Sequence, residues 1–317
     1  MKFEYSAVIR TLGTAGEKYQ HLLASLNNQS IAPNKIIVYI AEGYPLPAET
    51  IGKEQYVYVK KGMLAQRALD YNEVETEFIL FLDDDLRLST DEVAKMYDYL
   101  NKHNADVIAP DIFNNASRPF ANELMMALSG RMMPRQDDDR WGYKVMKNSG
   151  YSYNKHPRKN VYQSQTNAGA CFLCRKEDFI NAQLSQELWV DQVKYPLGED
   201  QVTYYKMHLQ GKKVMTYYDH GIEHLDGGNN MSADKERTVI YSDFRFKTIF
   251  WHRFILKPER RILAKLGSCI ALAYTFAFAF VVSIIKCRFD IVKIKYRAIM
   301  DGVRFIRSEE YKELPLI

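Results

Sequence analysis

The sequence contains little cysteine, with only four such residues among 317. So few cysteines exclude a disulfide scaffold. Cys171 and Cys174 have the spacing of half a zinc finger. The other half is missing, because Cys269 and Cys287 lie far away in apolar or basic surroundings. We therefore predict that Cys171 and Cys174 are buried thiols on a strand, with a metal site as the alternative.

The sequence also has no strong overall charge. Its formal net charge is +4 at pH 7, and we expect no nucleic-acid partner. The charge is uneven, however, because residues 247–307 are markedly richer in Lys and Arg than in acids, which predicts a local basic surface. The amino terminus lacks an apolar segment followed by small residues. We therefore expect no secretory signal and a cytoplasmic position for the main part of the chain.

No internal repeat or low-complexity tract interrupts the chain, and 47% hydrophobic content is enough for an ample core. Short apolar runs alternate with helical patterns in the first third. Strands are predicted at 6–12, 36–40, 56–59, 77–85 and 105–113, and helices at 16–29, 60–74 and 89–103. This alternation predicts an α/β fold with a mostly parallel sheet covered by helices on both faces. Ligands of such sheets bind beyond the carboxyl ends of the strands.

The middle of the chain is less regular. Between residues 114 and 160 the periodicity weakens, and we predict a polar loop there. This stretch contains an acidic triplet at 137–139 with no strand before it, which favours a solvated loop over a metal site. Order resumes with a helix predicted at 200–209 and a strand at 212–219.

A second acidic triplet ends a strand. The run "FILFLDDDLRLS" at 78–89 places Asp83, Asp84 and Asp85 directly after five apolar residues. Adjacent buried carboxylates are costly unless a cation neutralises them. Mg²⁺ or Mn²⁺ prefers carboxylate oxygens and commonly takes phosphate oxygens as further ligands. The triplet thus predicts a metal and a nucleotide-diphosphate partner, with a solvated turn as the alternative.

Several motifs occur in a fixed order from residue 3 to residue 226. They are "SAVIRTLG", "LLASLNNQSIAPNKIIVYIAEG", "KGMLAQRALDYNEVETEFILFLDDD", "GACFLCRKEDF", "LWVDQ" and "GEDQVTYYKMHLQGKKV". This ordered set resembles the GT-A fold (Rossmann-like) glycosyltransferases of the family 2 type. The resemblance implies an inverting transfer of a sugar from a nucleotide-diphosphate sugar, assisted by Mg²⁺ or Mn²⁺.

The resemblance also implies roles for single residues. Asp83 would contact the nucleotide, and Asp85 would be the metal-binding acid of the DxD motif. Asp84 belongs to the same site, with no separate role beyond its local charge. The nucleotide-sugar site would further include Thr11, Glu42, Arg67 and Gly169. The chain departs from the family pattern at Ala68, where an Asn is expected after the Arg.

The "GED" motif carries the expected base. By the resemblance, Asp200 deprotonates the acceptor hydroxyl, and Glu199 orients the acceptor or shares this role. Acids that stabilise a helix N-terminus are the structural alternative. His224 is expected to join Asp85 at the metal, with His220 as the other candidate. The "LDGG" loop after it would fold over the donor.

One aromatic residue is assigned to the acceptor. Trp189 precedes the "GED" motif, as the acceptor-side segment does in the family, and we expect it to bind the acceptor.

The carboxyl-terminal part differs in character. Residues 266–285 carry no charge and are long enough to cross a membrane as a helix. Basic residues lie on both sides of it, at Arg253, Lys257, Arg260, Arg261, Lys265, Lys286, Arg288, Lys293, Lys295 and Arg297. A single crossing would place one basic cluster outside, against the usual bias. We therefore favour a re-entrant or in-plane helix, while a single span stays open.

The last helical pattern fits a membrane surface. Its apolar positions recur at a helical spacing, at Val292, Tyr296, Ile299, Val303 and Ile306. Basic residues flank them, as in a helix on anionic lipid. We predict contact with the cytoplasmic face of the cell membrane through residues 253–307. Helices that pack on the main domain or in a dimer are the alternative.

These observations give one overall prediction. Residues 1–245 would form the catalytic domain, with a nucleotide-sugar half at 1–113 and an acceptor half at 160–230, and residues 246–317 a helical extension. The enzyme would transfer a sugar to a saccharide or polyprenyl-linked acceptor in cell-surface polysaccharide or glycolipid assembly. The alternatives are a sugar-nucleotide nucleotidyltransferase and a non-catalytic membrane-surface binding protein. The nucleotidyltransferase is disfavoured because "IRTLGTAGEKY" is a poor triphosphate loop.

Overall fold

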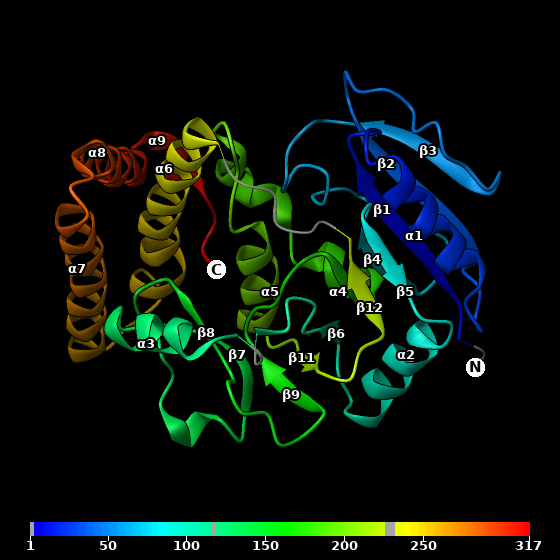
Figure 1. Ribbon diagram of the computed structural model, residues 1–317, viewed down its shortest axis with the longest axis horizontal. Coiled ribbons are helices and arrows are strands. Elements are labelled where there is room, and N and C mark those ends of the chain that lie inside the picture. Colours follow the sequence, from blue (N-terminus) through cyan, green and yellow to red (C-terminus); the bar gives the residue numbers. More distant parts are fainter. Residues whose placement is uncertain (1–2, 116–117, 226–231) are drawn as a thin grey trace.

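A large mixed sheet forms the centre of the computed structural model, which describes residues 3–115, 118–225 and 232–317 (Figure 1). Ten strands follow the order β3-β2-β1-β4-β10-β6-β11-β9-β7-β8. They are β1 Tyr5–Thr11, β2 Lys35–Ala41, β3 Glu54–Val59, β4 Phe78–Asp83, β6 Val107–Pro110, β7 Trp141–Val145, β8 Tyr151–Tyr153, β9 Val161–Ser164, β10 Cys171–Arg175 and β11 Val214–Tyr217. A separate two-stranded sheet pairs β5, Leu86–Leu88, with β12, Ile222–His224.

The first half of the large sheet is parallel. Strands β3, β2, β1 and β4 pair in parallel, so their carboxyl ends meet at one edge. Strand β10 then runs antiparallel between β4 and β6, and β6 pairs in parallel with β11. The α/β architecture expected from the alternating pattern is confirmed, with antiparallel strands added in the second half.

Helices cover both faces of this sheet. Helices α1, Glu17–Asn27, and α2, Glu92–Lys102, pack on one face, where alternate strand residues such as Ile9 and Leu82 are buried. Helices α4, Lys176–Asn181, and α5, Glu199–Leu209, pack on the other face. Side chains of successive strand residues point to opposite faces, so continuous apolar strands give two cores.

The cysteine prediction is confirmed. Cys171 and Cys174 both lie on β10, are fully buried and carry free thiols. Their side chains belong to different cores, because Cys171 packs on the face with α1 and Cys174 on the face with α5.

The helix predicted at 60–74 is wrong. This segment forms turns between β3 and β4. The carboxylate of Asp191 accepts hydrogen bonds from the backbone N–H of Leu64 at 3.1 Å and of Ala65 at 2.8 Å. A Cβ added to Gly62 would lie 2.3 Å from Oδ2 of Asp191. Asp191 thus fixes the amides at residues 64 and 65, and the turns of this segment are held by contacts with distant parts of the chain.

The polar loop predicted at 114–160 is also wrong for much of its length. It contains α3, Phe120–Leu128, a 3₁₀ turn, η2, at Arg135–Asp137, and the strands β7 and β8. Strand β7 joins the sheet through β9. Met126, Tyr143 and Tyr153 form a small core there. Such short strands give too few alternations to be recognised in the sequence.

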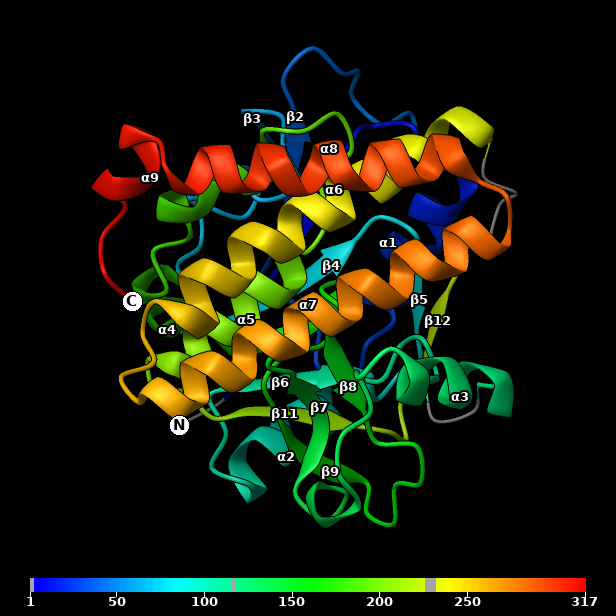
Figure 2. The same cartoon turned by 90° about the vertical axis from the view of Figure 1, so that its left-hand side faces the viewer.

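The carboxyl-terminal helices form a layer on one side of the molecule (Figure 2). They are α6 Ala233–Phe250, the π-helical segment η4 Trp251–Leu256, α7 Ile262–Ile285, α8 Phe289–Ile306 and α9 Glu309–Glu313. Phe246 and Phe250 of α6 belong to the same core as α5. Helix α8 approaches α6 closely at Gly302, whose added Cβ would lie 2.9 Å from Cβ of Thr248. The predicted domain boundary at 245 falls inside α6.

Candidate active site

The edge where β1 and β4 end carries a buried network of charges. Nε of Arg10 donates to Oδ1 of Asp83 at 2.6 Å, and Nη1 of Arg10 lies 2.8 Å from Oε1 of Glu199. Nη2 of Arg67 lies 3.7 Å from Oδ1 of Asp83. Two guanidinium groups thus join the acidic triplet of β4 to the first turn of α5.

Thr11 and Asp84 form the next part of this edge. The hydroxyl of Thr11 donates to Oδ2 of Asp84 and accepts from the backbone N–H of Gly13 at 2.8 Å. Burial raises the pKa of Asp84 to about 6. The hydrogen bond from Thr11 opposes this rise in pKa, and the charges of Asp83 and Asp85 add to it.

A cavity of about 710 Å³ opens above these residues. The side chains that line it come from β1, from the triplet and from the turns after β3 and before α5. They include Arg10, Thr11, Lys18, Lys61, Gln66, Asp83, Asp84, Asp85, Asp191 and Lys194. Lysines and carboxylates share its wall, which suits a phosphate group together with a divalent cation. We call this space the donor cavity.

Two metal candidates meet at the two-stranded sheet. Pairing of β5 with β12 sets His224 opposite Leu86, and Nε2 of His224 lies 3.6 Å from Oδ2 of Asp85. His220 is turned away, because its ring nitrogens lie at the carbonyl oxygens of Ile222 and Asp111. Asp85 and His224 could hold one divalent ion.

A divalent ion at this pair would need further ligands. Among the described residues, no group of three or more His, Cys, Asp or Glu side chains is placed to hold a metal. Diphosphate oxygens and water suit the remaining positions of Mg²⁺ or Mn²⁺. The predicted closure of the "LDGG" loop concerns Asp226, Gly227 and Gly228, which lie outside the described residues.

Glu199 and Asp200 begin helix α5 side by side. The cap residue, Gly198, has φ +85°, and an added Cβ would lie 2.2 Å from the ring of Phe246. Burial alone would raise the pKa of Glu199, but Arg10 and Arg67 lower it to about 2. Burial raises the pKa of Asp200 well above its usual value, and the charge of Glu199 adds to this. The pKa values of the two neighbouring carboxyl groups are thus shifted in opposite directions.

Gly169 lies next to this pair. Nη2 of Arg67 donates to its carbonyl oxygen, and an added Cβ would lie 2.0 Å from Oδ1 of Asp200. Oδ1 of Asp200 and Nε and Nη1 of Arg67 are buried without a hydrogen-bond partner among the residues that the structure describes. Such unsatisfied atoms mark a place where a ligand adds hydrogen bonds.

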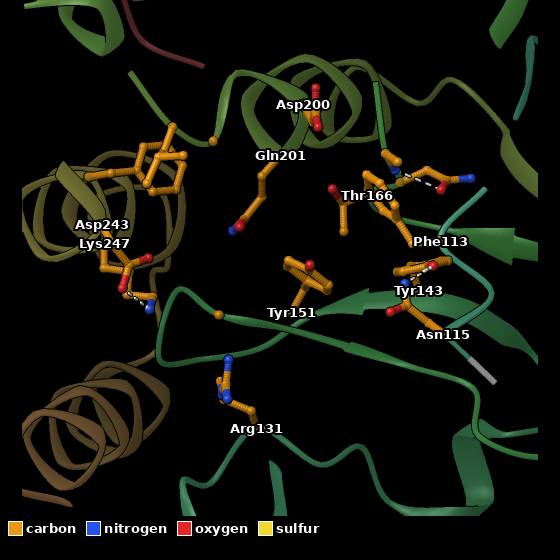
Figure 3. A pocket seen from close by; sticks show the side chains of 16 residues that line it. Phe113, Asn115, Arg131, Tyr143, Tyr151, Thr166, Asp200, Gln201, Asp243 and Lys247 are labelled. Atoms are coloured by element: carbon orange, nitrogen blue, oxygen red, sulfur yellow. Dashed lines mark hydrogen bonds and ion pairs between the residues drawn. The ribbon is translucent and has the colours of Figure 1, made fainter. Parts of the chain in front are cut away.

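A second cavity, of about 320 Å³, has Asp200 in its wall (Figure 3). Its wall comes from the segment around α3 and β8, from α5 and from α6. The lining includes Phe113, Asn115, Arg131, Tyr143, Tyr151, Thr166, Asp200, Gln201, Asp243 and Lys247. We call this space the acceptor cavity. Its α6 residues Asp243 and Lys247 lie on both sides of the predicted boundary at 245.

Two predicted residues lie elsewhere. Trp189 is only 2% exposed, stacks on Phe246, and donates its indole N–H to Glu187 at 2.8 Å. Its burial contradicts the prediction that Trp189 binds an acceptor. Glu42 is exposed after β2 and is absent from the described lining of the donor cavity.

Sequence reasoning missed three residues of the site. Arg10 directly precedes the predicted Thr11, and its position at a strand end was a usable signal. Asp191 stands in the "LWVDQ" motif, and only its contact with the turn at residue 64 reveals its role. No feature of the sequence indicates a role for Arg131, because the weak periodicity around it predicts a loop.

Comparison with known proteins shows that two overlapping segments of the chain resemble glycosyltransferase families. Residues 59–181 match the family model described as glycosyl transferase family 2, and residues 5–108 match the glycosyl transferase family 64 domain. The fold and both matches define a glycosyltransferase with a GT-A fold. The match to family 2 covers less than half of the chain, so it is the segment 59–181 that resembles this family. No curated protein matches it.

Among solved structures, the chain is similar to S. aureus TarS. One structure of TarS has a TM-score of 0.47 at 14% identity, covering 88% of this chain and 44% of that one. TarS 1–349 in complex with UDP-GlcNAc has a TM-score of 0.49 at 13% identity, covering 95% and 81%. TarS 1–349 alone has a TM-score of 0.48 at 15% identity, covering 89% and 73%. The chain thus spans less than half of the first structure.

Proposed function

We propose that this glycosyltransferase moves one sugar from a nucleotide-diphosphate sugar to a hydroxyl of a saccharide or lipid-linked acceptor, with inversion. The observation that carries this proposal is the position of Asp200 on the wall of the acceptor cavity, joined through Glu199 and Arg10 to Asp83 of the donor cavity. A base in the wall of one cavity, linked through charged side chains to the wall of the other, suits a direct displacement between a donor and an acceptor.

The donor side would bind and hold the diphosphate. Asp85 and His224 would hold Mg²⁺ or Mn²⁺, which when bound stabilises the negative charge of the leaving diphosphate. Lys18 and Lys61 line the same cavity and add positive charge. Asp83, fixed by Arg10, would face the nucleotide.

The acceptor side would supply the base. Asp200 must lose its proton before it can accept one from the acceptor hydroxyl. Its raised pKa makes the ionised form a stronger base than an exposed aspartate. Arg10 and Arg67 lower the pKa of Glu199, so Asp200 would be the stronger base of the two. Inversion requires that the hydroxyl activated by Asp200 attack the sugar on the face opposite the diphosphate.

The test is nucleotide release by the purified protein with Mn²⁺, a panel of nucleotide sugars and candidate acceptors. Asp200→Asn should lower kcat by about 10²- to 10⁴-fold with little change in the donor KM, because only proton transfer is removed. The acidic limb of the wild-type pH profile should lie above the usual range of an aspartate, with activity rising as pH rises, because the raised pKa of Asp200 delays its ionisation.

The control is Asp70→Asn, which removes an exposed carboxylate outside both cavities. Asp85→Ala should remove the response to Mn²⁺. Full transfer activity in both Asp85→Ala and Asp200→Asn would refute the mechanism.

We further propose that the enzyme works on the cytoplasmic face of the cell membrane, in the assembly of cell-surface polysaccharide or glycolipid. Helix α7 is the one helix among the described residues that is long and apolar enough to cross a membrane. Its outward stripe is exposed at Leu263, Leu266, Ile270, Tyr274, Val281 and Ile284. Exposed apolar surface of this extent favours contact with lipid.

Charge on the neighbouring helix favours an anionic bilayer as the partner. Lys293, Arg297 and Arg304 of α8 are exposed, although Arg297 and Arg304 share Asp301. Two basic residues of the predicted surface do not belong to it. Arg253 is buried against Glu187, and Lys295 is buried against the carbonyl oxygen of α7 residue 279.

Hydrogen bonds favour an in-plane helix over a spanning one. Thr275 of α7 donates to the carbonyl oxygen of Ser129, and Tyr274 donates to that of Leu128. Ser268 accepts from the indole of Trp251 at 2.7 Å. A helix that crossed the bilayer would lose these contacts along its length. Flotation with anionic liposomes measures the proposed contact.

A further inference from the structure

Arg131 is fixed at the edge of the acceptor cavity by the end of helix α3. Gly130 has φ +69°, and its N–H donates to the carbonyl oxygen of Ala127. The N–H of Arg131 donates to the carbonyl oxygen of Met126 at 2.9 Å. This pair of bonds around a left-handed glycine is a Schellman motif, which gives the chain a defined direction as it leaves the helix.

Helix α7 holds this turn in place. The side chain of Asn148 donates to the carbonyl oxygen of Gly130 at 3.1 Å and to the hydroxyl of Thr275 at 2.7 Å. That hydroxyl in turn donates to the carbonyl oxygen of Ser129. An added Cβ at Gly150 would lie 2.9 Å from Cδ of Arg131, so a side chain there would displace the arginine. The position of Arg131 is therefore set by packing on three sides.

The charge of Arg131 is not neutralised by the protein. Its Nε donates to the hydroxyl of Ser129 at 2.9 Å, and in the described part of the chain no carboxylate pairs with its guanidinium. Lys247, the other cation of the cavity, is paired with Asp243 at 2.5 Å. A half-buried guanidinium without a counter-ion favours an anionic ligand.

We propose that the acceptor carries an anionic group, a phosphate or a carboxylate, that Arg131 binds. This inference rests on the proposed function of the cavity. Asp200 lines the same cavity and would repel an anion in the ionised form that acts as the base, so the hydroxyl to be glycosylated would face Asp200 and the anionic group would face Arg131. Tyr151 and Gln201 project between them (Figure 3) and offer polar groups to the neutral part of the acceptor.

The structure gives the subsite a specific chemistry. Arginine binds oxyanions through two parallel N–H donors, and the Nη groups remain for this purpose because only Nε of Arg131 is engaged within the described residues. Lysine offers a point charge instead. Arg131→Lys should therefore retain part of the preference for anionic acceptors, and Arg131→Gln should lose it.

The experiment compares matched acceptors on the full chain. With the donor cavity filled by nucleoside diphosphate and Mn²⁺, calorimetry measures the binding of a sugar phosphate and of the same sugar without phosphate. A second pair, a polyprenyl phosphate and the matching polyprenol in detergent, distinguishes a lipid-borne anion from a soluble one. The control is Arg135→Gln, which removes an exposed arginine four residues away.

The expected result is a preference of about tenfold or more for the anionic member of at least one pair. Arg131→Gln should abolish this preference, Arg131→Lys should restore part of it, and Arg135→Gln should leave it unchanged. Equal binding of anionic and neutral members by the wild type, or an undiminished preference in Arg131→Gln, overturns the proposal. Nucleotide release by the wild type with its acceptor tests the transferase itself, so equal binding of the anionic and neutral members by an active wild type would refute only the anionic subsite.

Discussion

Neighbouring carboxylates of one triplet have different environments. Asp83 is held by Arg10, Asp84 accepts from Thr11, and Asp85 faces His224. The sequence placed all three acids at a strand end, but their partners come from strands β1 and β12, which are distant in sequence. The role of each carboxylate therefore follows from what surrounds it.

We predict that Asp84→Asn stabilises the ligand-free protein at neutral pH. The pKa of Asp84 is raised to about 6, so the folded state binds a proton that the unfolded state has released. Stability therefore falls as pH rises between about 4 and 6. The amide introduced by the substitution would keep an acceptor for Thr11 and remove this loss, adding about 1–2 kcal/mol above pH 7 after allowance for partial exposure.

Urea unfolding at pH 4.5 and pH 7.5 measures this effect. The difference between variant and wild type should grow with pH across that interval. Asp98→Asn, which removes an exposed carboxylate of α2, is the matched control. A variant that is less stable than the wild type at pH 7.5 would contradict the pKa argument.

At the scale of elements, helix α7 has two apolar faces with different surroundings. Its inner face packs on α6 and α8 through Leu272 and Phe276, while Leu263, Leu266 and Ile270 of its outer stripe are exposed. The uncharged run alone is compatible with a span, a re-entrant helix or a core helix. Packing along one face favours the in-plane arrangement.

We predict that the double substitution Leu266→Glu and Ile270→Glu reduces binding to anionic liposomes at least about tenfold. These side chains are 55% and 60% exposed, so folding should be little affected, while each loses up to about 2 kcal/mol of burial in lipid. Flotation at low and high salt measures binding, and salt should weaken it by screening the basic residues of α8.

Leu46→Glu is the control for this experiment, because Leu46 is 53% exposed in the loop after β2, away from α7 (Figure 1). Liposome binding by the double variant equal to that of the wild type would show that α7 does not contact the bilayer.

At the scale of the whole molecule, a buried charge cluster ties the carboxyl-terminal helices to the catalytic helix. Glu187 is fully buried and bonds to Arg253 of η4 at 2.5 and 2.6 Å and to Lys206 of α5 at 3.0 Å. Burial lowers the pKa of Lys206, and Glu187 opposes this. The helices after residue 245 are thus integrated with the helix that carries Asp200.

We predict that Glu187→Gln lowers the free energy of unfolding by about 3–5 kcal/mol, because it leaves the charges of Arg253 and Lys206 buried without a counter-ion. Denaturant unfolding measures the loss. Glu259→Gln is the control, since its partner Arg261 is 80% exposed and solvent screens such a pair, so its removal should leave stability nearly unchanged. Equal stability of Glu187→Gln and Glu259→Gln would refute the coupling.

The sequence by itself determined the sheet of the first half, the acidic edge and the order of motifs that marks a glycosyltransferase. These features depend on short stretches of the sequence. Apolar runs specify strands, and the carboxyl ends of parallel strands lie at the same edge of the sheet whatever segment follows. Asp85 and His224 were expected together, and the pairing of β5 with β12 brings them side by side.

Only the tertiary structure decided the rest. The turns at 60–74 are anchored by Asp191, which binds two of their amides. Trp189 is buried because α6 packs over it, and Arg131 reaches the acceptor cavity because α7 supports the end of α3. Each outcome depends on contacts between segments distant in sequence. Hydrophobic periodicity does not predict such contacts. It indicates which side of a helix or strand is buried, but not which other segment covers that side.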